Sequence, residues 1–269
     1  MNATATRLTS SFHHKQHLRF TPDGRHLVYA PTIGPRITLM AVPRAGGEER
    51  ILFAERRDDY IQQHPAWSPD ARRLAFTIND GLRNLRIGIF QCDADGLTFT
   101  NFRPLLMGGQ DSFPSWSPDG RQVAFIAGSQ RLNLANIDGT GRRTLGPLEG
   151  LSGQPSWSPR GDRIAFSSNH EGSMEIFTIR PDGRELTRLT RNDRVDYRPV
   201  FSPDGQRLAF TSSRDGNYDI YLMRLDGSEL RNLTSHPALD DHAAWSPDGR
   251  ELAFISTRDG GYDVYRVSV

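Results

Sequence analysis

Hydrophobic and polar residues alternate along this chain in short runs that return at a near-constant spacing. In the clearest stretch, apolar Val200 and Phe201 precede SPDG at 202–205, and RLAFT follows at 207–211. Pro in the second turn position and Gly in the fourth favour a type I turn. A polar loop, the run IYLMR at 220–224, an Asp-Gly pair and the run LRNLT at 230–234 complete the unit. The pattern predicts four short antiparallel strands.

The phrase that opens this unit occurs six times. It reads RFTPDGRHLVYA from Arg19, AWSPDARRLAF from Ala66, SWSPDGRQVAF from Ser115, SWSPRGDRIAF from Ser156, VFSPDGQRLAF from Val200 and AWSPDGRELAF from Ala244. The aromatic residues of successive phrases are 47, 49, 41, 44 and 44 residues apart. No useful stretch shows the 3.6-residue period of a helix. A repeated four-stranded unit is typical of a β-propeller, so we predict an all-β, six-bladed ring.

The two ends of the chain predict how the ring closes. The last repeat reaches Val269 after three strands, and the missing fourth strand has a counterpart near the N-terminus. TRLT at 6–9 matches TRLT at 187–190 and RNLT at 231–234. We expect this N-terminal strand to complete the sixth blade, within a single domain over 1–269. The alternative is that 6–9 is a frayed tail.

The repeat resembles that of the TolB-like six-bladed β-propellers. The pattern WSPDGxxLAFxSxRDGxxxIYxMxxDGxxLxxLT occurs almost intact at 201–234, with Phe201 in place of Trp. The resemblance covers essentially the whole chain and implies the propeller fold together with a protein or peptide partner. The α/β domain that precedes the propeller of TolB has no counterpart in this sequence. Similar propellers occur in proteins of unrelated activity, so the resemblance is specific for fold and not for function.

Composition and motifs exclude several classes of function. The 33 basic and 32 acidic residues give a net charge of +1, which argues against nucleic-acid binding. GxSxG, HExxH, CxxC and Gly-Lys pairs are absent, and Cys92 is the only cysteine. The chain has no long apolar run, so we do not expect membrane insertion. We expect a monomer. The absence of a signal-peptide pattern predicts the cytoplasm, or the periplasm if the chain is a trimmed mature form.

The predicted blades divide the ring into two faces. The turn face carries the SPDG turns and the turns between third and fourth strands, which are short and uniform. The loop face carries the second-to-third loops and the connections between blades, which differ among repeats. Because binding residues usually lie on variable loops held by a rigid scaffold, we predict function on the loop face. On the turn face, Ala71 replaces the usual Gly, and a positive φ there would cost about 1 kcal/mol.

The repeat also aligns six positions that lie three residues before each aromatic. They are His17, His64, Phe113, Gln154, Arg198 and His242. Since first strands line a propeller channel, these side chains should form a ring near its mouth, which we call the channel ring. The three histidines then belong to adjacent blades. With Tyr197 and Asp241 the six residues form the predicted binding site. Five residues before each aromatic come Lys15, Gln62, Asp111, Ser152, Asp196 and Asp240.

Three interpretations of the channel ring remain open from the sequence. Its polar side chains could simply fill and hydrate the channel. They could form a funnel that recognises an extended segment of a partner protein, or His17, His64 and His242 could form a metal or acid/base site. The last would suit a metal-dependent lyase or hydrolase with Ca, Mn or Zn in the channel. We favour a non-catalytic propeller that binds a protein or peptide.

Overall fold

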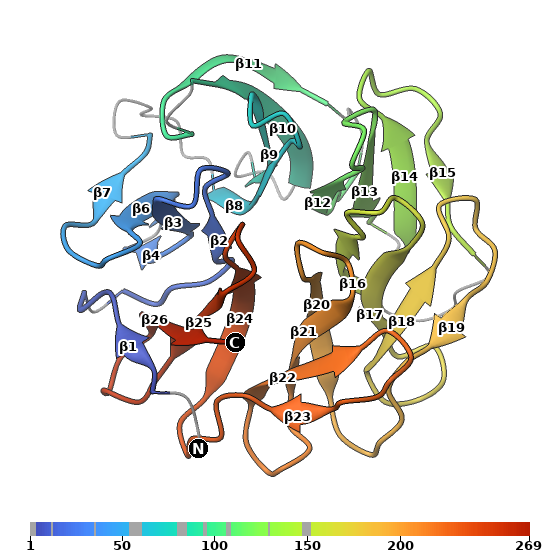
Figure 1. Ribbon diagram of the computed structural model, residues 1–269. Coiled ribbons are helices and arrows are strands. Elements are labelled where there is room, and N and C mark those ends of the chain that lie inside the picture. The colour runs from blue at the N-terminus through green and yellow to red at the C-terminus, as the bar shows by residue number, and fades with distance from the viewer. Residues whose placement is uncertain are drawn as a thin grey trace.

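The computed structural model describes residues 4–11, 13–34, 36–53, 61–79, 85–93, 96–105, 109–128, 130–146 and 152–269. Its regular elements are β-strands, and the four-stranded sheets are arranged as a ring (Figure 1). Within these ranges no helix is long and apolar enough to cross a membrane. The predicted all-β, six-bladed propeller is confirmed.

Each blade is an antiparallel sheet, and in the first five blades its four strands come from one stretch of the chain. Blade one contains β2 (Arg19–Phe20), β3 (His26–Tyr29), β6 (Met40–Pro43) and β7 (Arg50–Ile51). Blade two contains β8 (Ile61–Trp67), β9 (Arg73–Asn79), β10 (Leu85–Cys92) and β11 (Phe99–Pro104). Blade three contains β12 (Ser112–Trp116), β13 (Gln122–Ile126), β14 (Leu132–Asn136) and β15 (Arg143–Thr144). A small hairpin of β4 (Thr32–Ile33) and β5 (Arg36–Ile37) extends from the second-to-third loop of blade one.

The remaining three blades keep the same order. Blade four contains β16 (Ser152–Trp157), β17 (Ile164–Ser168), β18 (Glu175–Ile179) and β19 (Thr187–Arg188). Blade five contains β20 (Asp196–Phe201), β21 (Arg207–Ser212), β22 (Asp219–Arg224) and β23 (Arg231–Asn232). Blade six contains β24 (Asp240–Trp245), β25 (Glu251–Ser256), β26 (Asp263–Ser268) and, from the N-terminus, β1 (Thr6–Arg7).

The hydrophobic core lies between neighbouring blades. Between blades five and six, Val200 and Leu222 of one sheet pack with Trp245 and Phe254 of the next. Successive residues of a strand point to opposite faces of its sheet, so Leu208 and Phe210 belong to a different cluster from Ala209. The alternating pattern of the repeat therefore supplies apolar side chains to both faces of every blade, and each interface supports the next around the ring.

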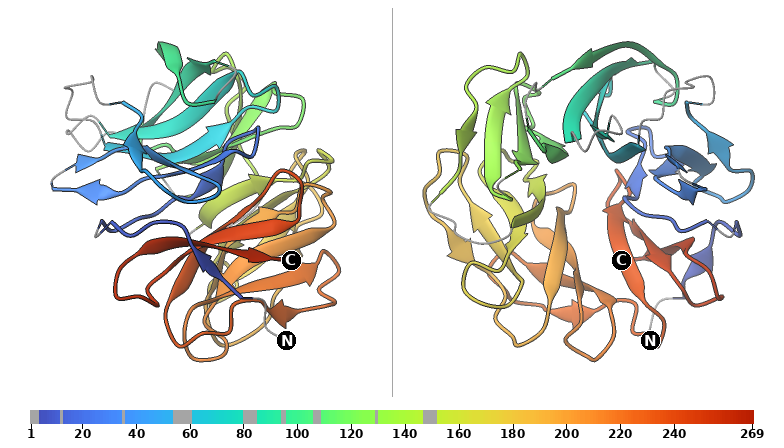
Figure 2. Two further views of the ribbon diagram at one scale, coloured as in Figure 1. Left: turned by 60° about the vertical axis from the view of Figure 1, so that its left-hand side comes forward. Right: turned by 180° about the vertical axis from the view of Figure 1, so that it is seen from behind.

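The N-terminal strand closes the ring as predicted. Thr6 pairs with Arg266 and Arg7 with Tyr265, so β1 lies alongside β26 (Figures 1 and 2). The backbone N–H of Leu8 donates to the Val264 carbonyl at 2.8 Å, and the Leu8 side chain is buried in the core. The alternative of a frayed tail at 6–9 is wrong.

The SPDG turns have the predicted backbone. Gly205 has a φ of 66°, and the Ser202 hydroxyl donates to Asp204, whose carboxylate also accepts from the Gln206 backbone N–H. These hydrogen bonds hold the pKa of Asp204 below its usual value. Ala71 occupies the same position in blade two with a φ of 59°. The strained alanine expected from the sequence is therefore present.

Candidate functional site in the channel

A bulge in five of the six first strands lies at the channel-ring residues. In β20 the pairing with β21 shifts between Tyr197 and Val200, and β8, β12, β16 and β24 shift at the equivalent place. All six ring residues have positive φ, between 23° at Gln154 and 58° at His17 and His242. Histidine tolerates this left-handed region better than most residues, which gives a backbone reason for three histidines here. The bulge turns the side chains toward one another.

The structure brings the predicted histidines together in the order expected from the repeat. The ring centroids of His17 and His64 are 3.9 Å apart, and those of His17 and His242 are 5.1 Å apart. Phe113 continues this row, with its centroid 3.7 Å from that of His64. His17, His242 and Gln154 are less than a tenth exposed. The void beside His17, His64, Phe113 and Gln154 measures only about 10 Å³, too small for an ordinary ligand.

Burial keeps the three imidazoles neutral. It lowers the pKa of His17, His64 and His242 well below the ordinary value of histidine. Neighbouring groups lower these pKa values further, His242 acting on His17, His17 on His64, and Arg198 on His242. The Thr77 hydroxyl lies 2.9 Å from His64 Nδ1, and Thr77 is 0% exposed.

The imidazoles do not fit a metal ion as they are arranged. His242 Nδ1 accepts a hydrogen bond from the His17 backbone N–H at 3.2 Å, and His64 Nδ1 is engaged by Thr77. The rings pack edge to face, at interplanar angles of 66° and 83°. Across the part of the chain that the structure describes, no three His, Cys, Asp or Glu side chains form a group that could hold a metal ion. The geometry thus gives no support to the predicted site of His17, His64 and His242.

Arg198 of the channel ring forms a second cluster with Tyr197 and Asp241. The Tyr197 hydroxyl donates to Asp241 Oδ2 at 3.0 Å, the Arg198 guanidinium forms an ion pair with the same oxygen, and the Thr211 hydroxyl donates to Asp241 Oδ1 at 2.8 Å. The Arg198 guanidinium also lies over the Tyr197 ring, 4.6 Å from its centroid. Burial first, and then the Asp241 charge, raise the pKa of Tyr197. These contacts hold a tyrosine and an arginine in fixed positions.

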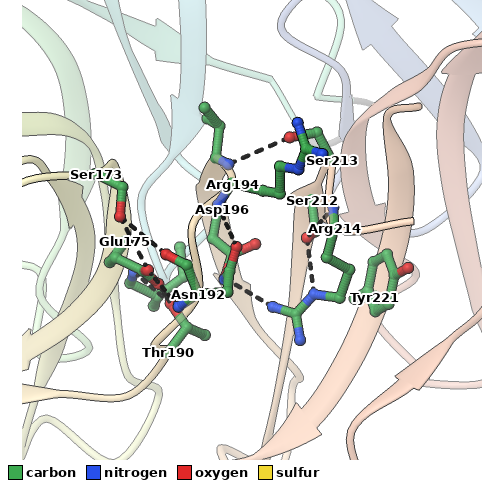
Figure 3. A network of polar contacts seen from close by, with 12 residues as sticks. Ser173, Glu175, Thr190, Asn192, Arg194, Asp196, Ser212, Ser213, Arg214 and Tyr221 are labelled. Atoms are coloured by element: carbon green, nitrogen blue, oxygen red, sulfur yellow. Dashed lines mark hydrogen bonds and ion pairs between the residues drawn. The ribbon is translucent and has the colours of Figure 1, made fainter. Parts of the chain in front are cut away.

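The acidic residues five positions before the aromatics, Asp111, Asp196 and Asp240, form ion pairs with arginines of the fold. Arg214 donates to Asp196 at 2.7 Å across the loop of blade five, and its guanidinium lies 4.8 Å from the Tyr221 ring centroid (Figure 3). Arg258 binds Asp240 through two hydrogen bonds of 2.9 and 3.1 Å, and Arg142 binds Asp111 through two of 2.7 and 2.9 Å. The side chains of Gln62 and Ser152 lie outside the described residues. Lys15 is buried and forms an ion pair with Asp263 at 3.0 Å.

Sequence reasoning missed Arg19 and the cavity next to it. Arg19 lies between the channel ring and a cavity of about 590 Å³ that is lined by all six repeat phrases and opens on the turn face. The turns around this cavity are uniform, as expected, but their centre is hollow. The sequence does carry one sign of this difference. Blade one has an arginine immediately before the aromatic, where the other phrases have Ala, Ser or Val.

Comparison with known proteins agrees with this architecture. A family model described as the TolB beta propeller domain matches residues 73–218 and 195–269, well over half of the chain. The chain belongs to the TolB β-propeller family. A search among curated proteins finds no match for this family member.

Solved structures show the same fold at low sequence identity. A putative TolB from Agrobacterium tumefaciens is 19% identical with a TM-score of 0.76, over 98% of this chain and 96% of that chain. TolB from Acinetobacter baumannii is 21% identical with a TM-score of 0.69, and the match covers 97% of this propeller and 65% of that chain. An oligogalacturonate lyase in complex with manganese is 17% identical with a TM-score of 0.64, covering 99% and 93%. At these identities the likeness concerns the fold alone.

Proposed function

We propose that this TolB-family propeller is a non-catalytic scaffold that binds a protein or peptide segment at the loop-face mouth of its channel. The observation that carries the proposal is the Tyr197, Arg198 and Asp241 cluster. Tyrosine and arginine are the residue types that most often dominate the binding free energy of protein interfaces. Here both are fixed by one buried carboxylate before any partner arrives, which reduces the entropy lost on binding.

The channel ring forms the floor of this proposed site. Phe113 and His64 contribute ring edges and faces, while Gln154, His17 and His242 are almost fully buried and close the channel behind them. A partner would therefore engage the mouth without threading through the ring. The neutral imidazoles and the Arg198 to Asp241 pair leave little net charge at this floor, which favours aromatic and hydrogen-bonding groups on the partner over strongly charged ones.

Selection of peptides on the immobilised full chain tests the proposal. A library of displayed random peptides is selected against the wild type, and the recovered peptides are titrated calorimetrically against the wild type and a Tyr197→Ala/Arg198→Ala variant. We expect the double substitution to weaken binding at least about tenfold, the scale of losing one hot-spot residue. Arg160→Ala on the turn face is the matched control and should leave the affinity unchanged.

Two further measurements make the result decisive. Thermal unfolding of each variant verifies that it folds, and Tyr197→Phe removes only the hydroxyl that donates to Asp241. Failure to recover any peptide, or equal affinity of the wild type and the double variant, would overturn the proposal. Recovered peptides that bind the wild type and Arg160→Ala equally, but not the double variant, support it.

A further inference from the structure

The turn-face cavity is built from equivalent residues of all six blades. Each blade contributes the residue before the aromatic, the aromatic itself and the proline of the turn that follows, and four blades also contribute the hydroxyl residue before that proline. The resulting volume of about 590 Å³ lies within the range of small-molecule sites. All four tryptophans of the chain, Trp67, Trp116, Trp157 and Trp245, line it. The walls are therefore largely apolar and aromatic.

Arg19 is the one charged residue among the described residues that line this cavity. The equivalent residues on the other blades have short side chains. They are Ala66, Ser115, Ser156, Val200 and Ala244, so Arg19 contributes the one guanidinium at this position of the repeat. Its NH1 group donates to the Leu18 carbonyl at 2.7 Å. Over the described ranges, no carboxylate pairs with it. The arginine thus brings an uncompensated positive charge to the cavity.

The surrounding charges do not cancel that of Arg19. Burial, and then the charge of Arg198, lower the pKa of Arg19 to about 10, which still leaves it protonated at neutral pH. Arg198 is itself balanced by Asp241, and the three histidines are neutral. One net positive charge therefore remains in the channel. A desolvated charge without a partner is unfavourable, so an anion that reaches Arg19 would gain strongly from pairing with it.

Two serines at the same level supply further donors. The Ser115 hydroxyl oxygen accepts from the Trp157 backbone N–H at 3.0 Å, and that of Ser156 accepts from the Phe201 backbone N–H at 3.2 Å. In each case the oxygen is engaged as an acceptor, and no acceptor for the hydroxyl hydrogen occurs among the described residues. Both hydroxyls line the cavity. Together with Arg19 they form one floor of hydrogen-bond donors beneath apolar walls.

We propose that the turn-face cavity binds the carboxylate of an apolar ligand, with Arg19 pairing the charge and Ser115 and Ser156 donating to it. One unpaired cation matches a monoanion, whereas a phosphate dianion would leave a second charge desolvated. The shared chemistry is a carboxylate on an apolar body, which either a free organic acid or the C-terminus of a peptide provides. None of Tyr197, Arg198 and Asp241 lines this cavity, so each proposal is tested with its own variants.

Tryptophan fluorescence reports on this cavity, because every tryptophan of the chain lines it. The full chain is titrated with 4-phenylbutanoate and with its neutral amide, and calorimetry measures the affinities. We expect the acid to bind more tightly than the amide by about tenfold or more, since a hydrogen bond to a charged group is being compared with a neutral one. Inorganic phosphate should bind more weakly than the acid.

Variants assign the effect to the proposed donors. Arg19→Met should weaken binding of the acid by about tenfold or more and leave the amide unchanged, while Arg19→Lys should retain part of the affinity. Ser115→Ala/Ser156→Ala should weaken the acid by a smaller factor. Arg121→Met is the matched control, because Arg121 is exposed on the same face and does not line the cavity.

The two sources of the carboxylate are then compared. N-acetyl-Ala-Phe and its C-terminal amide are titrated in the same way. The favoured source is whichever acid, 4-phenylbutanoate or N-acetyl-Ala-Phe, binds the wild type more tightly and binds Arg19→Met more weakly than the wild type. Removing a half-buried charge without a carboxylate partner in the described ranges should not prevent folding, and a thermal melt of Arg19→Met verifies this. The proposal is overturned if neither acid binds, if phosphate binds more tightly than either, or if Arg19→Met binds the acids as the wild type does.

Discussion

The Thr9 hydroxyl donates a hydrogen bond to Asp263 at 2.8 Å, joining residues 254 positions apart in the sequence. The contact belongs to the repeat, because the Thr234 hydroxyl donates to Asp219 at 3.1 Å and the Thr190 hydroxyl donates to Glu175. An acidic residue at the start of each of these third strands thus holds the threonine that follows the fourth strand. In blade six this interaction also ties the N-terminus to the last strand.

Removing the Thr9 hydroxyl should weaken closure of the ring. Thr9→Val keeps the side-chain shape but leaves the buried Asp263 carboxylate with one donor fewer and the Val264 N–H without its acceptor. We expect a loss of about 1 to 3 kcal/mol in the free energy of unfolding, measured by urea denaturation. Thr234→Val in blade five is the matched control and should cost a similar amount.

Deleting residues 1–10 extends this test. It removes β1 and the buried Leu8, so the fall in melting temperature should far exceed that of Thr9→Val. An unchanged melting temperature after the deletion would contradict the role of the N-terminal strand in closure.

The only lysine of the chain reports whether the ring is closed. The Lys15 ammonium is buried, forms an ion pair with Asp263 and donates to the carbonyls of Ser11 and Tyr262. In the folded protein, an amine acylating reagent should modify the N-terminal amine and leave Lys15 unmodified, as measured by peptide mass mapping. Thr9→Val should speed acylation of Lys15, and equal rates in folded and urea-unfolded protein would show that the lysine is accessible.

The sequence repeat predicted which residues of different blades occupy equivalent positions, but it did not predict the surroundings of their side chains. Counting back from each aromatic placed His17, His64 and His242 on adjacent blades, because the strand register repeats from blade to blade. It could not show that these residues have positive φ, or that His64 and His242 lie in bulges, since bulges depend on pairing with the next strand. It also aligned the carboxylates of Asp196 and Asp240, but it could not show that Arg214 and Arg258 form ion pairs with them.

The cavity at Arg19 was missed for a different physical reason. Whether a charged side chain is paired depends on residues from several blades, and no spacing along one repeat reveals it. The short, uniform turns led us to predict function on the loop face, whereas the aromatic and proline side chains of the six phrases surround a central cavity on the turn face. In the sequence, Arg19 is visible only as a departure from the repeat. The structure is needed to show that its side chain lines a cavity and has no carboxylate partner among the described residues.

Ala71→Gly should stabilise the propeller. Ala71 has a φ of 59°, a conformation that costs a non-glycine residue about 1 kcal/mol, so glycine should raise the free energy of unfolding by about that amount. Gly249→Ala is the reciprocal control, because Gly249 has a φ of 69° and an added methyl would meet Pro203 at an ordinary distance of 3.7 Å. It should lower stability by a similar amount. A destabilised Ala71→Gly protein would rule out this explanation.

The metal content of the purified protein distinguishes a metal site at His17, His64 and His242 from a channel ring without metal. Because His242 Nδ1 and His64 Nδ1 are engaged with the His17 N–H and Thr77, we expect purified protein to carry no stoichiometric Ca, Mn or Zn bound by the channel ring. Elemental analysis after dialysis against chelator-free buffer measures this directly. One equivalent of metal that disappears in a His17→Gln/His64→Gln/His242→Gln variant would instead support the metal-dependent enzyme.

Stability should fall as the pH drops below about 6.5. Burial lowers the pKa of His17, His64 and His242 in the folded protein, so the unfolded chain binds protons that the folded chain does not. The stability they support is present above the unfolded pKa of about 6.5 and is lost at about 1 kcal/mol per histidine for each pH unit below it. Urea denaturation at pH 7.5 and 5.5 measures the loss.

The triple glutamine variant identifies the groups responsible. Glutamine already occupies the equivalent position on blade four with positive φ, so it suits the ring backbone. The variant should lose less stability than the wild type between pH 7.5 and 5.5, because three buried groups no longer titrate in the unfolded chain. His13→Gln, outside the ring, should keep the wild-type dependence. Identical pH dependence in the triple variant and the wild type would show that the channel histidines do not govern acid stability.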